Sequence, residues 1–261
     1  MDTLVQSYLD YLHVDRSMAA NTITTYTRSL RTLPGVATAT REDVEAWWRA
    51  RAHLAPASRV NELAAIRSFY HWCLIWEHRD DDPTLRIPTL KVPKGLPRPV
   101  SRADLYILLD SAAPEMRRAI CLGAYGGLRV SEVASLSWLD VDTEMSRVRV
   151  LGKGGKTRLV GLSPLLLDAL LPDTGGNVVT GTSKRYSAAV LQRKVNRFIS
   201  AAGVHATFHQ LRHRFGTIAV GSGANLLAVS RAMGHASPAT TAIYAATSDA
   251  ELDIIALAVV R

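Results

Sequence analysis

The sequence has little of what disulfide-rich, zinc-bound and membrane-spanning proteins require. Only two of its 261 residues are cysteines, Cys73 and Cys121, and each lies in an apolar segment typical of a helix. Two such residues are expected to be buried thiols in a reducing compartment rather than a disulfide framework. No apolar run approaches the roughly 20 residues of a membrane-spanning helix, and the N-terminal residues do not resemble a secretory signal. We therefore predict a cytoplasmic protein with no membrane partner.

Acidic residues are also in the minority, with 23 Asp and Glu against 31 Lys and Arg, which gives a formal net charge of +8 and a sequence pI near 9.8. A basic surface binds polyanions because phosphate contacts release condensed counterions. Charge alone is equally compatible with a basic protein that binds no nucleic acid. The hydrophobic share of 48% over this length is enough for the cores of two modest domains.

The order of periodic segments predicts a mainly α-helical protein of two domains. Residues 1–90 carry apolar residues at helical spacing, and Asn21 is expected to cap the second helix there. Residues 91–100 are rich in proline and basic side chains, which predicts an extended linker. Residues 101–261 form the second domain, beginning with a helix capped by Ser101.

One segment of the second domain departs from the helical pattern. Residues 147–151 and 156–160 each alternate apolar and polar side chains, and Gly152-Lys153-Gly154-Gly155 between them supplies turn residues. This pattern predicts a β-hairpin. Helices are expected to resume at Ser163, where Ser-Pro precedes a leucine run.

Five ordered motifs suit chemistry on a phosphodiester. Two of them contain an arginine: Gly127-Leu128-Arg129-Val130-Ser131-Glu132 and His209-Gln210-Leu211-Arg212. The guanidinium group of an arginine can bind two phosphate oxygens at once. The other three are the lysine of the predicted hairpin turn, Gly234-His235, and Tyr244, nine residues after that histidine. A phenolate can attack phosphorus. In this order and spacing, the chain resembles the tyrosine recombinases, the phage integrases and Xer-like chromosome-dimer resolvases, over nearly its whole length.

The resemblance implies a role for each motif residue. Tyr244 is expected to be the nucleophile, Arg129 and Arg212 the phosphate clamp, and Lys153 the general acid for the leaving 5′-oxygen. Two histidines are expected to address phosphate oxygens or the tyrosine proton, and an acidic residue to orient the site. These are His209, His235 and Glu132. His213, beside Arg212, is expected to be structural.

Further expectations follow from the resemblance. It implies an N-terminal helical core-binding (SAM-like) domain and a C-terminal mixed α/β catalytic domain, which bind double-stranded DNA core sites as a homotetramer without an arm-binding domain. Strand exchange would pass through a Holliday junction, and a host or phage directionality factor is a further candidate partner. Candidate DNA contacts outside the catalytic set are Arg59, Arg67 and Lys156. No cofactor or metal is expected.

Two other motif interpretations fail on the sequence. Gly155-Lys156-Thr157 lacks the glycine that a phosphate-binding P-loop requires five positions earlier, where Val150 stands. His209 and His213 lack the glutamate of a His-Glu-x-x-His zinc motif, because Gln210 follows His209. Two functional alternatives remain: a type IB topoisomerase that relaxes DNA as a monomer, and a DNA-binding regulator on an inactive recombinase fold.

Overall fold

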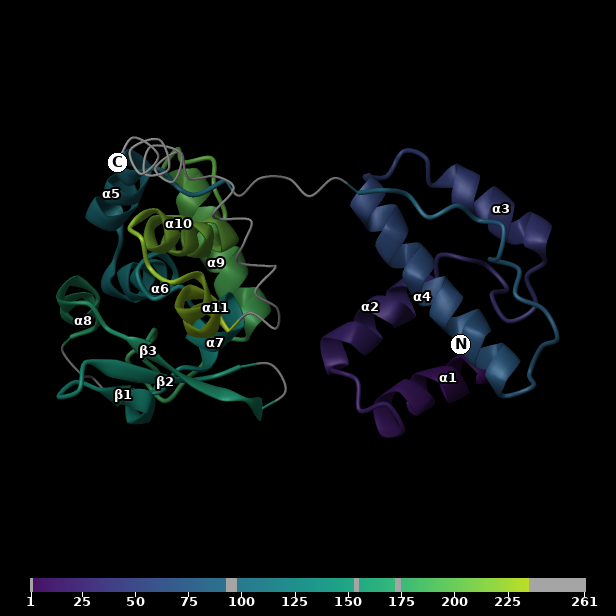
Figure 1. Ribbon diagram of the computed structural model, residues 1–261, viewed down its shortest axis with the longest axis horizontal. Helices are drawn as coiled ribbons and strands as arrows, with labels where there is room; N and C mark the ends of the chain where they lie inside the picture. The colour runs from purple at the N-terminus through teal and green to yellow at the C-terminus, as the bar shows by residue number, and fades with distance from the viewer. Residues whose placement is uncertain (1, 93–97, 153–154, 172–174, 235–261) are drawn as a thin grey trace, which may run out of the picture. The chain divides into compact units, whose positions relative to one another are not determined.

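A computed structural model describes residues 2–92, 98–152, 155–171 and 175–234. The chain forms two compact units, Met1–Lys94 and Gly95–Arg261, and the boundary falls inside the predicted linker of 91–100 (Figure 1). Each unit has its own hydrophobic core and is described separately. Across the described ranges, none of the helices is both long enough and apolar enough to cross a membrane.

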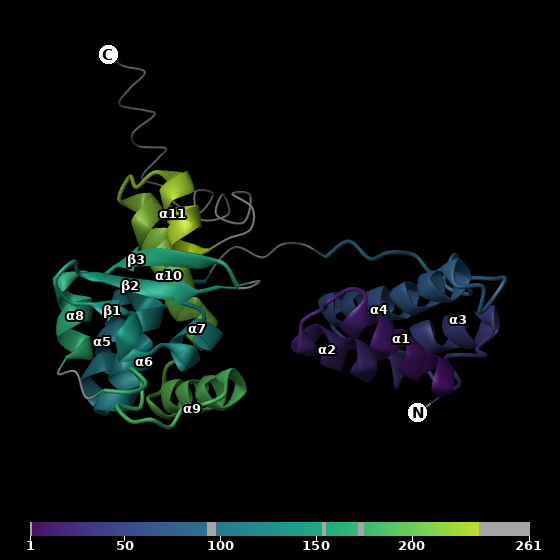
Figure 2. The same ribbon diagram turned by 90° about the horizontal axis from the view of Figure 1, so that it is seen from below.

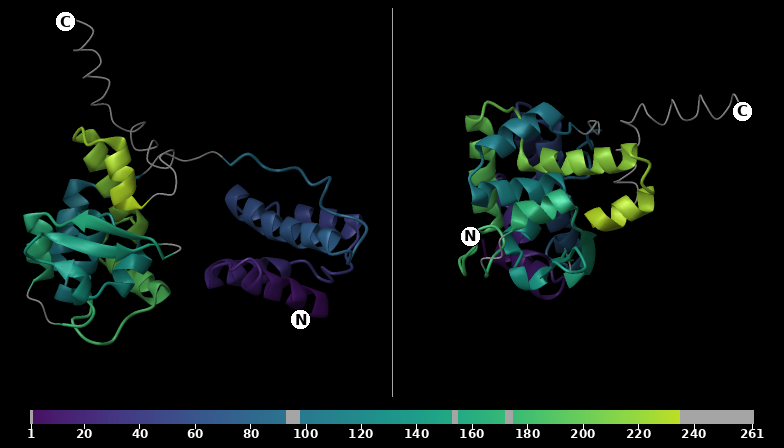
Figure 3. Two further views of the ribbon diagram at one scale, coloured as in Figure 1. Left: turned by 60° about the horizontal axis from the view of Figure 1, so that its bottom comes forward. Right: turned by 90° about the vertical axis from the view of Figure 1, so that its left-hand side faces the viewer.

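The described residues of the N-terminal unit form a bundle of four helices, which the left-hand view of Figure 3 shows most clearly. They are α1 (Thr3–Val14), α2 (Ala20–Leu30), α3 (Arg41–Ala50) and α4 (Pro56–Ile75). The core is rich in aromatic rings. Tyr8 on α1 contacts Phe69 on α4 edge to face, with ring centroids 5.4 Å apart, a favourable geometry for the ring quadrupoles. Both phenols buried in this core are satisfied, because Tyr8 donates to Ser68 Oγ and Tyr70 donates to the carbonyl of Val36, each at 2.7 Å.

The predicted cap of the second helix is wrong. Helix α2 begins at Ala20 after Ala19, which makes no side-chain cap, so Asn21 lies inside the first turn. The hydroxyl groups of Thr24 and Thr25 donate back to the carbonyls of Ala20 and Asn21, one helical turn earlier. A polar residue that can cap a helix also fits its first turn, and the sequence pattern does not distinguish the two.

The C-terminal unit combines seven α-helices among its described residues with a three-stranded sheet. The helices are α5 (Arg102–Ser111), α6 (Pro114–Ala124), α7 (Val130–Ser135), α8 (Pro164–Leu170), α9 (Ala188–Ala201), α10 (Phe208–Gly221) and α11 (Leu226–Met233). The strands are β1 (Val141–Asp142), β2 (Arg147–Leu151) and β3 (Thr157–Gly161), in the order β1-β2-β3. A short 3-10 turn, η1 (Trp138–Asp140), leads into β1. The mainly helical architecture with a small sheet is confirmed.

The predicted hairpin is present as β2 and β3, which pair antiparallel with Val148 opposite Val160 and Val150 opposite Arg158. The valines lie on the buried face of the sheet, as the alternation requires. Figure 2 shows the sheet against the helices, with α11 beside β3. Arg158 shares the face of Val160 and therefore points toward the helices rather than toward solvent.

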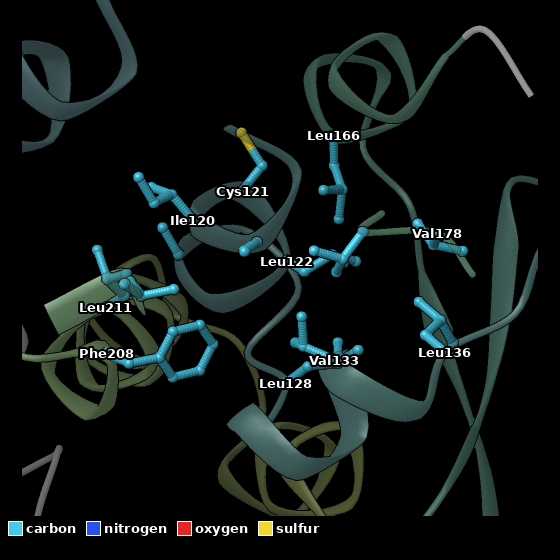
Figure 4. Packing of buried hydrophobic residues seen from close by; sticks show 14 of the residues in the cluster. Ile120, Cys121, Leu122, Leu128, Val133, Leu136, Leu166, Val178, Phe208 and Leu211 are labelled. Carbon is cyan, nitrogen blue, oxygen red and sulfur yellow. The ribbon is translucent and has the colours of Figure 1, made fainter. Parts of the chain in front are cut away.

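The core of this unit is centred on α6 (Figure 4). Its side chains Ile120 and Leu122 are fully buried, together with Leu211 from α10 and Leu128 from the turn before α7. The predicted caps at Ser101 and Ser163 are confirmed, because their hydroxyl oxygens accept from the amides of Asp104 and Leu166. Helices α7 and α10, which both pack against α6, carry Arg129, Glu132, His209 and Arg212.

Candidate active site

The centre of the site is a buried carboxylate that collects arginines. The Glu132 side chain is only 3% exposed, and its two oxygens accept four hydrogen bonds. The backbone N–H of Arg129 donates to Oε2 at 2.8 Å and its Nη1 donates to Oε1 at 2.9 Å. Arg158 binds in a fork, with Nη1 donating to Oε1 at 2.7 Å and Nη2 to Oε2 at 2.8 Å. Arg212 Nη1 lies 4.0 Å from Oε2, so three guanidinium groups surround one negative charge.

The same three arginines bind the C-terminal end of α11. Arg158 Nε donates to the carbonyl of Ala232 at 2.7 Å, Arg212 Nη2 to that of Met233 at 2.7 Å, and Arg129 Nη2 to that of Gly234 at 2.6 Å. The last carbonyls of a helix lack partners within the helix and carry partial negative charge, so cationic donors stabilise them. Three consecutive carbonyls, directly before His235, are therefore fixed by three different segments of the chain.

Two glycines of the recognised motifs are required by this geometry. Gly127 has φ +64°, and a Cβ at this position would lie 2.5 Å from the ring of Phe215. Its carbonyl accepts from Arg212 Nη1 at 2.6 Å, so the turn both leads to Arg129 and holds the second arginine. Gly234 has φ +63°, and a Cβ there would lie 3.0 Å from Arg158 Nη1. Any other residue would strain the backbone at both positions, and it would crowd the Phe215 ring at 127 and the arginines at 234.

Two histidines of α10 stand beside the arginines. The rings of His209 and His213 meet edge to face with centroids 4.3 Å apart. The protein atoms around the partly exposed ring of His209, followed by the charges of Arg212 and Arg129, lower its pKa. Burial, then His209 and Arg212, lower the pKa of His213 to about 4. Both rings are therefore neutral at neutral pH, and a neutral imidazole can accept a proton.

Electrostatics keep Glu132 ionised despite its burial. Burial raises the pKa of its carboxyl group, but the hydrogen bonds from Arg158 and from the amide of Arg129 outweigh this and lower the pKa below its ordinary value. One carboxylate does not neutralise three guanidinium groups, so the site retains an excess of positive charge. The Arg129 side chain is 36% exposed, which leaves it accessible from solvent.

The structure brings Arg129, Glu132, His209 and Arg212 together. Three other predicted site residues, Lys153, His235 and Tyr244, lie outside the described residues. Gly152 and Gly234, which directly precede Lys153 and His235, are described, and both lie close to Arg158.

The candidate DNA contacts lie elsewhere. Lys156 is exposed at the end of the hairpin. Arg59 is half-buried, with its guanidinium carbon 4.0 Å from the centroid of a Trp48 ring. Arg67 is half-buried and donates to Thr89 Oγ1 and to the carbonyl of Ile87. In this structure, both bundle arginines therefore bind their own unit.

Arg158 is a site residue that the sequence pattern did not identify. It sits in the alternating run of the hairpin, where an arginine is typical of an exposed strand position. Its partners lie 26 and 74 residues away along the chain, at Glu132 and Ala232. The available signal was its phase, because Arg158 alternates with Val160, which faces the core.

Within the described parts of the chain, no three His, Cys, Asp or Glu side chains lie close enough together to bind a metal ion. The ionisable groups around Glu132 are arginines and histidines. This set suits phosphate oxygens, because arginine forks match their geometry and spread the charge.

Several known proteins are similar to this chain in sequence, in fold or in both. The family described as "Phage integrase family" matches residues 105–251, and "Phage integrase, N-terminal SAM-like domain" matches residues 5–78. Tyrosine recombinase XerC of Xanthomonas campestris pv. campestris (strain B100) is 33% identical, over 92% of this chain and 83% of its own. XerD of the same pathovar (strain ATCC 33913 / DSM 3586 / NCPPB 528 / LMG 568 / P 25) is 30% identical, over 93% and 87%.

A similar fold occurs in a solved DNA complex. The crystal structure of a lambda integrase(75-356) dimer bound to a COC′ core site aligns with a TM-score of 0.76 at 18% identity, over 94% of each chain. At that identity the likeness establishes the fold alone. Together with the family matches and the arginine motifs around Glu132, it leads to one conclusion: the chain belongs to the phage integrase family and is an enzyme of the tyrosine recombinase class.

Proposed function

We propose that this protein is a site-specific DNA recombinase that cleaves and rejoins duplex DNA through a covalent bond between Tyr244 and a 3′-phosphate. The observation that carries the proposal is the convergence of Arg129, Arg158 and Arg212 on Glu132. An excess of guanidinium groups on a rigid scaffold is suited to a phosphodiester, whose negative charge grows on the non-bridging oxygens during attack.

In the proposed cleavage step, the Tyr244 oxygen attacks phosphorus and the bond from phosphorus to the 5′-oxygen breaks. The tyrosine proton passes to a neighbouring base, and His209 is available for this because its lowered pKa keeps the ring neutral. Lys153 donates a proton to the departing 5′-oxygen. Arg129, Arg212 and His235 bind the non-bridging oxygens. The phosphotyrosyl bond conserves the energy of the broken bond, so rejoining needs no ATP.

The proposed assembly follows the family resemblance. Four protomers would bind two core sites and exchange strands in pairs through a Holliday junction, in the cytoplasm where the DNA lies. The N-terminal bundle would supply part of the site recognition. Its contacts with bases set the target sequence, which the reaction chemistry does not specify.

Covalent capture tests the cleavage step. Wild-type protein and Tyr244→Phe are incubated in EDTA with nicked duplexes carrying a random central sequence, or with DNA flanking the protein's own gene, and then denatured with detergent. We expect DNA linked to the wild type only, and sequencing of the captured DNA then gives the site. A complex that survives Tyr244→Phe would contradict the proposed nucleophile. Absence of any complex would favour an inactive DNA-binding regulator.

The captured site also separates recombination from relaxation. Two copies of the site on one supercoiled plasmid are incubated with the protein. Recombinant circles and four-way junctions, detected on gels, support the recombinase. Relaxation of plasmids that lack the site would instead support the topoisomerase alternative.

A further inference from the structure

We propose that Arg158 is a positioning residue for the phosphate clamp: through Glu132 and the end of α11 it fixes the guanidinium of Arg129 in its working orientation. The inference rests on the proposed function, because it assigns a role within that reaction. Arg158 is not suggested to touch the DNA.

Arg158 binds the buried carboxylate of Glu132 through two hydrogen bonds. Its fork supplies two of the four hydrogen bonds that Glu132 accepts, and it does so from a side chain that is only 13% exposed. Glu132 in turn accepts from both the backbone and the side chain of Arg129. A carboxylate held by a two-pronged partner cannot rotate without breaking both bonds, so the fork fixes the direction in which Glu132 presents its oxygens to Arg129.

The third nitrogen of the same guanidinium binds the end of α11. Arg158 Nε donates to Ala232 at the end of α11, two residues before the carbonyl of Gly234 that accepts from Arg129 Nη2. Arg158 thus binds Glu132, one of the two groups that accept from the Arg129 guanidinium, and also binds the helix end that carries the other, the carbonyl of Gly234. Lysine carries the same charge but has only one nitrogen, and it cannot bind two carboxylate oxygens and a carbonyl in this planar arrangement.

Arg158 lies on the hairpin where the end of β2 comes close to Glu132. A Cβ on Gly152 would lie 3.6 Å from Arg158 Nη1 and 3.9 Å from Glu132 Oε1, so the end of β2 packs against the ion pair. Arg149, on the opposite face of β2, also pairs with an acidic residue, donating to Asp140 from Nε and Nη2. That pair is exposed, and its two bonds join β2 to η1 rather than to α11. Arg149 is therefore a matched control for an arginine ion pair on the hairpin.

The test uses the full-length protein and the captured site, with the variants Arg158→Lys, Arg158→Ala and Arg149→Ala. Single-turnover formation of the covalent complex is measured on nicked duplexes, and DNA affinity is measured separately. We expect both Arg158 variants to slow cleavage by about 10- to 100-fold, the loss typical when a residue that orients a metal ligand is removed, with DNA affinity unchanged. Arg149→Ala is expected to match the wild type. The lysine variant retains the charge, so it covers the case in which the alanine variant fails to fold.

Two altered phosphates separate positioning from a general structural defect. A methylphosphonate at the scissile position removes the negative charge that the clamp must stabilise, so the deficit of Arg158→Lys relative to wild type is expected to shrink. A 5′-bridging sulfur removes the need for a general acid and is expected to leave the deficit unchanged. Equal deficits on all three substrates would show a merely structural role. A deficit that shrinks only on the 5′-bridging sulfur substrate would show that Arg158 supports proton donation by Lys153 instead. Either of these two results overturns the proposal.

A measurement without DNA keeps the inference separate from the proposed function. The amide of Arg129 donates to Glu132, so its hydrogen exchange reports the orientation of the carboxylate. We expect faster exchange at this amide in Arg158→Lys and no change in Arg149→Ala. Unchanged exchange in Arg158→Lys would overturn the positioning role even if the wild type cleaves DNA. Failure of the wild type to cleave, with faster exchange in the variant, would count against the proposed function alone.

Discussion

Arginine does different work in the two units of this protein. In the N-terminal bundle three arginines lie over aromatic rings and donate to nearby backbone carbonyls, so that each stabilises a separate part of the bundle. The pairs are Arg51 over Trp47, Arg59 over Trp48 and Arg79 over Tyr70. In the C-terminal unit three arginines converge on one carboxylate and one helix end. Dispersed arginines add local stability, whereas convergent arginines create a concentration of charge that a phosphate can bind.

The most damaging single change to the convergent group is expected to be Glu132→Ala. It leaves three guanidinium groups close together with their shared counter-charge gone, and breaking a buried ion pair costs about 3–5 kcal/mol of stability. Chemical denaturation of the C-terminal unit measures the loss. The control is Arg149→Ala, which breaks the exposed pair with Asp140 and is expected to cost about 0–1 kcal/mol. Equal losses in the two variants would contradict the special position of Glu132.

Gly234→Ala tests how closely the arginines approach the end of α11. Gly223→Ala is the matched control, because Gly223 has φ +80° and no atom of the described residues within 4 Å of the place a Cβ would take, whereas Gly234 has φ +63° and two arginines beside it. The left-handed backbone costs alanine about 1–2 kcal/mol at both sites. Only Gly234→Ala is expected to lose more than this and to slow covalent complex formation. Similar behaviour of the two variants in unfolding and cleavage assays would refute the crowding argument.

Arg59→Ala tests the dispersed group. The guanidinium lies over the Trp48 ring and donates to the carbonyl of Trp48, so its removal is expected to cost about 1–2 kcal/mol in unfolding of the bundle. The control, Arg49→Ala, removes a largely exposed arginine paired with Glu45 one turn away and is expected to cost about 0.3–0.5 kcal/mol. If Arg59 also contacts DNA, Arg59→Ala will lower the affinity for the DNA site more than Arg49→Ala does. A binding titration at fixed salt would show this difference.

The smallest effect near neutral pH is expected from His213. Its pKa is about 4 in the folded protein against 6.5 ordinarily, so the unfolded chain binds the proton first as pH falls. Stability is therefore lost between pH 6.5 and pH 4 and is fully present above this window. Unfolding free energy measured against pH should slope less steeply in His213→Gln than in wild type. An unchanged slope in His213→Gln would refute the prediction.

Local patterns predicted local structure well. The alternation around Gly152 gave the hairpin, and the serines at 101 and 163 gave two helix starts, because each signal depends on residues within a few positions of one another. The cap at Asn21 was wrong since capping and first-turn positions accept the same residue types. The two-residue strand β1 was not predicted, because Val141–Asp142 is too short to alternate and pairs only in the folded sheet.

Long-range partnerships could be predicted only in part. The motifs placed Arg129, Glu132, His209 and Arg212 in one site, and they do lie together. No sequence pattern predicted that Glu132 is buried. None predicted that it binds Arg158, which lies on β3, 26 residues later in the chain. Such a contact depends on the phase of the strand and on the packing of α11 against it, which are properties of the whole unit.

The left-handed turn at Gly234 gives a criterion for comparing genomes. A homologous chain that keeps every reactive side chain is still expected to cleave DNA more slowly if a bulkier residue occupies this position, because its arginines would be displaced from the helix end. Catalogues of recombinases that score only the reactive residues would count such a chain as intact. A bulkier residue in place of this glycine is therefore expected to mark an impaired gene at a position that supplies no reactive side chain.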